Sequence, residues 1–163
     1  MIDSSPSPAL ANVRLEAADH HHLDEVVAIM DAAFDDRFGE AWTRSQCAGI
    51  LPMRGVSMLL ARNDAGEAIG FSLQRLVAGD GELLLLAVDP KYRRRGVGRA
   101  LLKQFIDQAR EEGTSKVHLE VRDGNPAVIM YRNAGFRAVG RRRKYYHGRT
   151  GGEFDALTLC FDL

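Results

Sequence analysis

The segment that most constrains the fold is an apolar run that leads into a basic, glycine-containing turn. The run reads GELLLLAV (residues 81–88), and YRRRGVGRALL follows at residues 92–102. A strand that is apolar at nearly every position is buried on both faces, as at the centre of a sheet. Beyond the turn, apolar residues recur at Leu101, Leu102 and Phe105, which is the spacing of an amphipathic helix. The segment therefore predicts a central strand followed directly by a long helix.

Residues on both sides of this segment predict further strands and helices. Asp19 and Thr43 are expected N-caps, and Gly113 and Gly135 are expected helix ends. The predicted strands are 13–18, 56–62, 68–77, 81–88, 115–122, 136–146 and 153–163, and the predicted helices are 20–34, 43–51, 98–112 and 127–134. This order indicates a single α/β (α+β) domain over residues 13–163, after a leader at 1–12 that we expect to be disordered.

Composition and charge exclude several classes of function. A chain of 163 residues suits one domain with its own core. Lys+Arg and Asp+Glu both number 22, so the net charge is zero, which argues against direct nucleic-acid binding. No apolar run reaches the roughly 18 residues that span a bilayer, so we expect no membrane partner. Cys47 and Cys160 are far apart and are expected to be free thiols in a reducing, cytoplasmic setting.

The basic turn is a candidate phosphate site. Gly96 and Gly98 lack Cβ atoms where a ligand could approach the backbone. The first turn of the following helix offers unpaired N–H groups and the positive end of the helix dipole. The turn is neither a P-loop, which needs GxxxxGK[ST], nor a dinucleotide fingerprint, because Leu101 stands where that motif needs glycine. Taken alone, Arg93-x-x-Gly96-x-Gly98 is also compatible with a solvated basic turn that caps a helix.

Further stretches make the turn more specific. AVDP (residues 87–90) precedes it, and LEVR (119–122), MYRNAGF (130–136) and the tail RRRKYY…GGEFDALTL (141–159) follow. In this order, the stretches resemble the Gcn5-related N-acetyltransferase (GNAT) family. They are most similar to its RimI branch, which acetylates the N-terminal alanine of a ribosomal protein. The resemblance covers most of the chain from about Val13.

The resemblance implies a fold and a cosubstrate. The fold is a mixed central sheet of about six to seven strands with about four helices, in which the strands flanking the long helix splay apart. The cosubstrate is acetyl-CoA, without a metal. Its pyrophosphate would lie against the turn, its pantetheine arm would pair with the strand edge and with Asn125, and the Val88 N–H would polarise the thioester carbonyl. The implied cofactor-binding residues are Leu86, Ala87, Val88, Arg93, Arg94, Arg95, Gly96, Val97, Gly98, Arg99 and Asn125.

Two residues are candidates for the proton transfers of acetylation. Tyr131 is the implied general acid that protonates the departing thiolate, and the alternative is a packed tyrosine with an ordinary hydrogen bond. Glu120 is the candidate general base. It points away from the apolar face of Leu119 and Val121, and a carboxylate near the splay is costly unless it is used or paired. The alternative is a salt bridge to Arg122 or to a neighbouring Lys or Arg.

The acceptor is expected to be a protein N-terminus, possibly that of a ribosomal protein. An α-amine has an ordinary pKa of about 7.7–8.0, against about 10.4 for a lysine, so a carboxylate is a better base for the former. The alternatives are a small amine or a lysine side chain as acceptor, or a CoA-binding module without turnover. Candidate walls of the acceptor groove are Phe38, Glu40, Trp42, Tyr145 and Tyr146, of which Trp42 and the two tyrosines could instead be packing residues.

Three other features bear on the site. Asn125 and Tyr131 lie one residue closer together than is usual in the family, which affects the position of Asn125 more than that of Tyr131. The histidines at residues 20–22 are adjacent on a helix and should point apart, so we expect no metal site. The basic run at 141–144 suits a solvated strand edge better than a contact with an acidic partner or RNA. The oligomeric state does not follow from the sequence.

Overall fold

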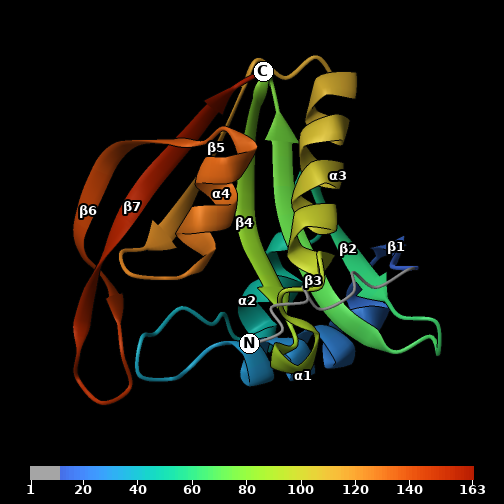
Figure 1. Cartoon of the computed structure of the whole chain (residues 1–163), viewed down its shortest axis with the longest axis horizontal. Helices are drawn as coiled ribbons and strands as arrows, with labels where there is room; N and C mark the ends of the chain where they lie inside the picture. The colour runs from blue at the N-terminus through green and yellow to red at the C-terminus, as the bar shows by residue number, and fades with distance from the viewer. Residues whose placement is uncertain (1–11) are drawn as a thin grey trace, which may run out of the picture.

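The computed structural model describes residues 12–163, in which seven strands form one mixed sheet (Figure 1). The strand order is β1-β2-β3-β4-β5-β7-β6. The strands are β1 (Arg14–Ala18), β2 (Val56–Arg62), β3 (Ala68–Val77), β4 (Asp80–Val88), β5 (Lys116–Arg122), β6 (Arg137–His147) and β7 (Glu153–Asp162). The α-helices are α1 (Leu23–Ala33), α2 (Arg44–Ile50), α3 (Val97–Glu111) and α4 (Ala127–Ala134). The predicted fold class and order of elements are confirmed.

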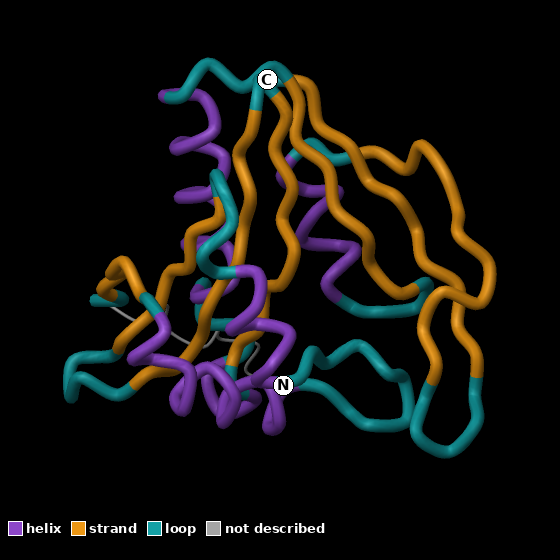
Figure 2. Tube along the Cα trace, turned by 180° about the vertical axis from the view of Figure 1, so that it is seen from behind, coloured by secondary structure: helices purple, strands orange, loops and turns teal. Residues whose placement is uncertain are grey.

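The helices cover both faces of the sheet. Opposite views show α3 and α4 on one face and α1 and α2 on the other (Figures 1 and 2). Leu101 and Phe105 of α3 are fully buried, as the helical spacing predicted. On the other face, Val26 and Met30 of α1 are fully buried and pack with Phe71 of β3. Apolar cores therefore lie on both faces of the sheet, which explains why the central strand β4 is apolar at every position from Leu83 to Val88.

A β-bulge lets the central strand β4 serve both cores. Leu73 of β3 pairs with Leu85, whereas the next residue, Gln74, pairs with Leu83, so Leu84 is an extra residue in β4. The extra residue reverses the alternation of the strand. Leu83 consequently packs in the core under α3, and Leu85 packs in the core under α1. The uninterrupted leucine run predicted burial on both faces but carried no signal for this bulge.

The helix ends follow the predicted capping residues, with one difference at the first helix. Thr43 caps α2 in a capping box with Gln46, and Gly135 ends α4 at φ 113°. Asp19 caps as expected, but residues 20–22 form a 3₁₀ turn, and α1 begins only at Leu23. The Nδ1 atom of His22 accepts a hydrogen bond from the Asp19 N–H at 3.0 Å, which tightens this first turn.

All strands of the described residues belong to this one sheet. Among them, no helix combines the length and the apolar character needed to cross a membrane. The disordered leader expected at 1–12 lies outside the described residues, apart from Asn12 at its end.

Candidate functional site

The site begins where the two central strands separate. β4 and β5 are the only parallel neighbours in the described sheet, and they pair only over Asp80–Leu83 and Lys116–Leu119. Beyond these residues, β4 continues against β3, and β5 continues against β7. The facing edges of the two strands therefore have no strand partner in this part of the sheet. This is the divergence that the resemblance implied.

A cavity of about 180 Å³ lies at this divergence. Segments that are far apart in the sequence meet there: the α1–α2 loop, β4, β5, α4 and the far end of β6. The cavity is lined by Phe34, Glu40, Trp42, Glu82, Leu83, Leu84, Leu85, Leu86, Leu119, Glu120, Val121, Asn125, Tyr131, Tyr145 and Tyr146. The structure thus brings both proton-transfer candidates together with most of the predicted acceptor residues.

Glu120 reaches the cavity from β5 with its carboxylate nearly buried. Its Oε2 atom accepts a hydrogen bond from the Thr158 hydroxyl at 2.8 Å, and Thr158 is its direct partner on β7. Its Oε1 atom lies 3.2 Å from Nε of Arg142 on β6. Of the ion pairs weighed as the alternative to a base role, the one with Arg122 does not form, because Arg122 points to Glu40, whereas a pair with another arginine, Arg142, is present.

Tyr131 enters the cavity from the second turn of α4. Its ring is buried and packs edge-to-face on Phe136, with ring centroids 5.9 Å apart. Burial raises the pKa of its phenol well above the ordinary value of 10, and the charge of Glu40 raises it further. Its hydroxyl has no hydrogen-bond partner among the described residues. The Tyr131 phenol is therefore protonated at neutral pH, and its hydroxyl makes no hydrogen bond to a described residue.

Asn125 is engaged within the protein on both sides of its amide. Its Oδ1 atom accepts from the Ala127 N–H at 2.9 Å at the start of α4. Its Nδ2 group donates to Oε2 of Glu40 at 2.8 Å. The shortened loop thus turns this amide toward the α1–α2 loop, and a contact with pantetheine would have to be shared with Glu40.

Glu40 is a functional candidate that sequence reasoning placed only loosely near the groove. Its Oε1 atom accepts from Nε of Arg122 at 3.0 Å, and both side chains are about one-tenth exposed. The guanidinium of Arg122 in turn lies 3.7 Å from the ring centroid of Phe38. Glu40 thus brings a second buried carboxylate to the cavity. The local sequence gave no signal for it, because its partners lie more than 80 residues away.

The predicted aromatic walls divide into two groups. Trp42, Tyr145 and Tyr146 line the cavity, whereas Phe38 does not. Phe38 instead lies behind it, between Arg122 and Phe154, whose ring centroid is 5.1 Å away. Both tyrosines reach the cavity because β6 is irregular between Arg142 and Tyr146, where the regular alternation is lost. Burial raises the pKa of Tyr146 as well, and its hydroxyl donates to the Glu120 carbonyl at 3.4 Å.

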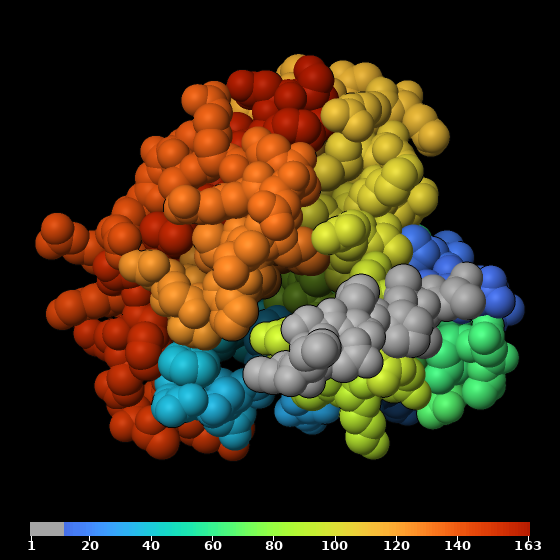
Figure 3. Space-filling view, viewed as in Figure 1, coloured from blue at the N-terminus to red at the C-terminus, as the bar shows by residue number. Residues whose placement is uncertain are grey.

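The α1–α2 loop and the β6–β7 hairpin meet beside the cavity (Figures 1, 2 and 3). The Arg149 N–H donates to the Asp36 carbonyl at 3.0 Å. A Cβ atom on Gly39 would lie 2.1 Å from the His147 carbonyl oxygen, and one on Gly148 would lie 1.9 Å from that of Arg37. Only glycine permits this backbone approach. The two loops are therefore held together close to residues of each that line the cavity, namely Glu40 and Trp42 on one side and Tyr145 and Tyr146 on the other.

The basic turn lies at the start of α3, as predicted. Gly96 has φ 85°, which requires glycine, and a Cβ atom there would meet nothing within 4 Å. At Gly98, α3 approaches α4 closely, because a Cβ atom there would lie 3.2 Å from Sδ of Met130. Arg93 is already engaged, donating to the Ala33 carbonyl at 2.8 Å. Arg94 and Arg95 are exposed, and the guanidinium of Arg95 lies 5.7 Å from the centroid of the Tyr92 ring.

The chemistry of the site fits an extended thioester such as acetyl-CoA. The β4 edge at Leu86 has β3 on one side, where it faces Ser72, and no strand on the other. Open backbone N–H groups at the α3 terminus suit a pyrophosphate. The free hydroxyl of Tyr131 lies at the divergence between these strands. The open β4 edge and the basic turn lie close together, because a Cβ atom on Gly98 would be 3.6 Å from the Val88 side chain, and Tyr131 lines the cavity where β4 and β5 diverge.

The histidine run departs from the geometry expected of it. Ligand atoms of Asp19, His20 and His21 all lie within 4.8 Å of one another, and all three residues are exposed. Asp19 holds the cluster together. Its Oδ1 atom accepts a hydrogen bond from the His21 backbone N–H at 2.9 Å and lies 3.1 Å from Nδ1 of the His21 ring. Its carboxylate is therefore used as a helix cap.

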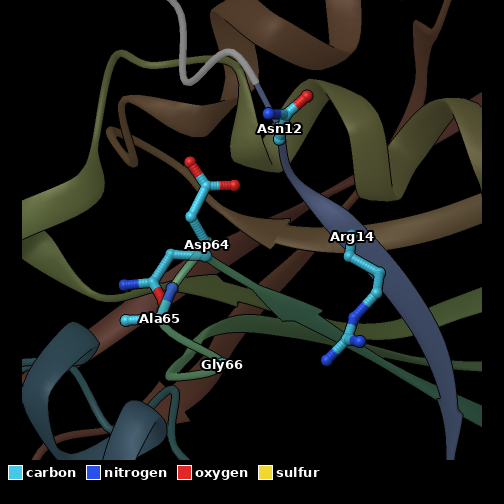
Figure 4. Close-up of a pocket in the computed structure, with 6 residues that line it drawn as sticks. Asn12, Arg14, Asp64, Ala65 and Gly66 are labelled. Carbon is cyan, nitrogen blue, oxygen red and sulfur yellow. The ribbon is translucent and has the colours of Figure 1, made fainter.

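A second hollow, of about 450 Å³, lies between the start of β1 and the β2–β3 turn (Figure 4). Asn12, Arg14 and Asp64 are among the residues around it. Asn63 also lines it, but its Oδ1 atom is used by the turn itself, accepting from two backbone N–H groups at 3.0 Å. None of the predicted site residues lies there, so the candidate site remains the cavity between β4 and β5.

A mixed sheet whose parallel strands diverge beside a basic, glycine-containing helix start is the architecture of an N-acetyltransferase. Residues 23–136 match the model of the acetyltransferase (GNAT) family. The chain belongs to this family, whose members use acetyl-CoA. The acetyl-CoA-dependent activity expected from the sequence is thereby confirmed.

Two curated relatives and two solved structures illustrate the similarity. The chain is 34% identical over 123 residues to the ribosomal protein bS18-alanine N-acetyltransferase of Escherichia coli K12, covering 75% of this chain and 81% of that protein. It is 40% identical over 102 residues to N-alpha-acetyltransferase RimI of Mycobacterium tuberculosis, covering 60% and 61%. The crystal structure of the Escherichia coli S18-alanine enzyme superposes with a TM-score of 0.81 at 27% identity, over 93% and 94% of the chains. Arabidopsis thaliana NAA60 with acetyl-CoA has a TM-score of 0.79 at 19% identity over 93% and 99%, which speaks for the fold alone.

Proposed function

We propose that this chain transfers the acetyl group of acetyl-CoA to the α-amine of a protein N-terminus, with the N-terminal alanine of a ribosomal protein as the first candidate. The observation that carries the proposal is the one cavity that Glu120 and Tyr131 share at the divergence of β4 and β5. The names of the Escherichia coli and Mycobacterium tuberculosis relatives support the same acceptor class.

The thioester supplies an activated acetyl carbonyl, and the chain has to hold it in place. The open β4 edge at Leu86–Val88 would pair with the amides of the arm, as one strand pairs with another. The Val88 N–H would polarise the carbonyl, as a fixed backbone donor can without reorganisation. At the other end, the N–H groups from Arg94 to Arg99 would hold the pyrophosphate.

The chain's own residues would carry both protons. The Glu120 carboxylate, oriented by the Thr158 hydroxyl at 2.8 Å, would take a proton from the acceptor amine directly or through a water. The Tyr131 hydroxyl would give its proton to the departing sulfur. Because burial raises its pKa, this phenol stays protonated throughout the neutral range.

The loop contact beside the cavity favours a chain terminus over a lysine side chain. The α1–α2 loop and the β6–β7 hairpin are joined next to Glu40, Trp42, Tyr145 and Tyr146, which line the cavity, so we expect this contact to block the path of a peptide on that side. A peptide whose N-terminal amine is the acceptor leaves the cavity in one direction only. A peptide with an internal lysine has chain on both sides of the acceptor and needs room in two directions. The lower ordinary pKa of an α-amine, about 7.7–8.0, also makes it the easier amine for a carboxylate base.

The direct test is thiol release from acetyl-CoA with two peptides. One has a free N-terminal alanine and no lysine, and the other is blocked at its N-terminus and has an internal lysine. We expect acetylation of the first alone. Acetylation of the second alone would overturn the acceptor class but keep the activity. Tight CoA binding without thiol release with either peptide would indicate that the acceptor is a small amine or that the chain is a non-catalytic CoA-binding module.

The loop contact gives a matched pair of variants. In Gly39→Ala, the new methyl group would collide with the His147 carbonyl at 2.1 Å and separate the loops. Gly66→Ala has a similar positive φ, 80° against 69°, but nothing lies within 4 Å of its Cβ position. Both should lose about 1–2 kcal/mol of stability from the strained φ. We expect Gly39→Ala alone to raise the KM for the alanine peptide, by about tenfold or roughly 1.4 kcal/mol. Equal KM values in the two variants would contradict a role of this loop contact in acceptor binding.

A further inference from the structure

The two buried carboxylates of the cavity, Glu40 and Glu120, are neutralised by arginines in very different ways. Arg122, the partner of Glu40, has a side chain only 10% exposed. It also stacks on Phe38 at 3.7 Å, and its NH1 group donates to the Asp123 carbonyl at 3.4 Å. These contacts hold it from several directions, so Glu40 and Arg122 form a fixed pair.

Arg142, the partner of Glu120, is held far more loosely. Its side chain is 62% exposed, while that of Glu120 is 13% exposed. It lies on β6, the outermost strand, at the point where the register with β7 shifts. Beyond the Glu120 contact at 3.2 Å, the described structure gives it only the Tyr145 ring, 5.6 Å from its guanidinium. An exposed side chain with a single ion pair can move away from its partner at a small cost in free energy.

The position of Arg142 is one that an acceptor amine would need. An N-terminal amine reaches the site as an ammonium ion for part of the time near neutral pH. The nearly buried Glu120 carboxylate attracts such a cation, but a guanidinium already in place repels it. Thr158 occupies the other carboxylate oxygen at 2.8 Å. The ammonium ion and the guanidinium therefore compete for the Oε1 side of Glu120.

We propose that Arg142 is a displaceable counter-ion of Glu120, which neutralises and positions this carboxylate in the free enzyme and gives way to the acceptor's ammonium group. The proposal rests on the proposed function, because it takes the acceptor to be an amine. One cation then replaces another at the same oxygen, so the nearly buried carboxylate never lacks a partner. Arg142 is on this view a positioning residue that selects acceptors basic enough to carry a charge.

Steady-state kinetics with Arg142→Ala tests the competition. We expect the KM for the alanine peptide to fall about two- to fivefold, the factor that corresponds to an exposed ion pair, with kcat little changed. Arg142→Lys should return KM toward the wild-type value, because it restores the competing charge. Arg143→Ala is the matched control, since Arg143 is an exposed neighbour that forms no ion pair with a described residue. A lower kcat with unchanged KM in Arg142→Ala, or an equal KM change in Arg143→Ala, would overturn the exchange.

A binding measurement separates this proposal from the proposed function. The side-chain Nε–H signal of Arg142 can be followed by nuclear magnetic resonance in the CoA-bound protein labelled at arginine. We expect the alanine peptide, and methylammonium as the simplest amine cation, to move this signal to its position in Glu120→Gln. The N-acetylated peptide, which lacks the cation, should leave it in place. Absence of a shift with both cations rejects the exchange, whereas a shift without acetylation of the peptide keeps the exchange and rejects only the proposed acceptor.

Discussion

Replacing Tyr131 with phenylalanine is expected to lower kcat by about 10²–10⁴-fold, the usual contribution of a general acid. The variant removes one hydroxyl that has no partner among the described residues, so the ring should keep its packing on Phe136. The thermal stability of the variant should therefore change little, while kcat falls strongly. Kinetics over a wide pH range, together with thermal unfolding, measures both quantities. Turnover that matches the wild type at every pH would show that Tyr131 is not the acid.

Tyr146 provides the comparison for this variant. It lines the same cavity, and burial raises the pKa of its phenol as well. Its hydroxyl, however, already donates to the Glu120 carbonyl at 3.4 Å. We therefore expect Tyr146→Phe to have a much smaller effect on kcat than Tyr131→Phe. The reverse order would transfer the acid role to Tyr146.

Replacing Glu120 with glutamine is expected to lower kcat/KM by about 10²–10⁴-fold at neutral pH. Glutamine keeps an oxygen for the Thr158 hydroxyl but cannot take a proton from an ammonium ion. Above the amine's own pKa of about 7.7–8.0, the acceptor is already neutral, so the deficit should shrink as the pH rises toward about 9. A pH–rate profile of the variant and the wild type with the alanine peptide measures this convergence.

Two outcomes would contradict the role of Glu120 as a base. A variant that folds less stably but turns over normally would make the residue a structural partner of Arg142 and Thr158. Glu82→Gln is the matched control, because Glu82 lines the same cavity from β4 and its contact with His118, at 3.8 Å, lies away from Thr158. An equal loss in Glu82→Gln would mean that the charge of the cavity matters rather than one proton acceptor.

The local patterns of the chain determined most of the fold. The strand at 81–88, the capping residues Asp19 and Thr43 and the terminating Gly135 each act over a few residues, so their signals are readable from neighbouring positions. The turn around Gly96 alone was also compatible with a solvated basic turn, and it was the resemblance of AVDP, LEVR, MYRNAGF and the tail to the GNAT family that implied an acetyl-CoA-dependent acetyltransferase. Glu120 and Tyr131 became candidates because each stands inside one of these local motifs.

Only the tertiary structure decided how the side chains of the site are paired. Glu40 meets Arg122 and Asn125, and Glu120 meets Arg142, because β5 and β6 are brought together across β7 while the α1–α2 loop folds back on them. Which cation reaches which carboxylate depends on strand register and on the irregularity of β6 after Arg142. Such contacts act through space between residues far apart in the chain, and no local periodicity carries information about them.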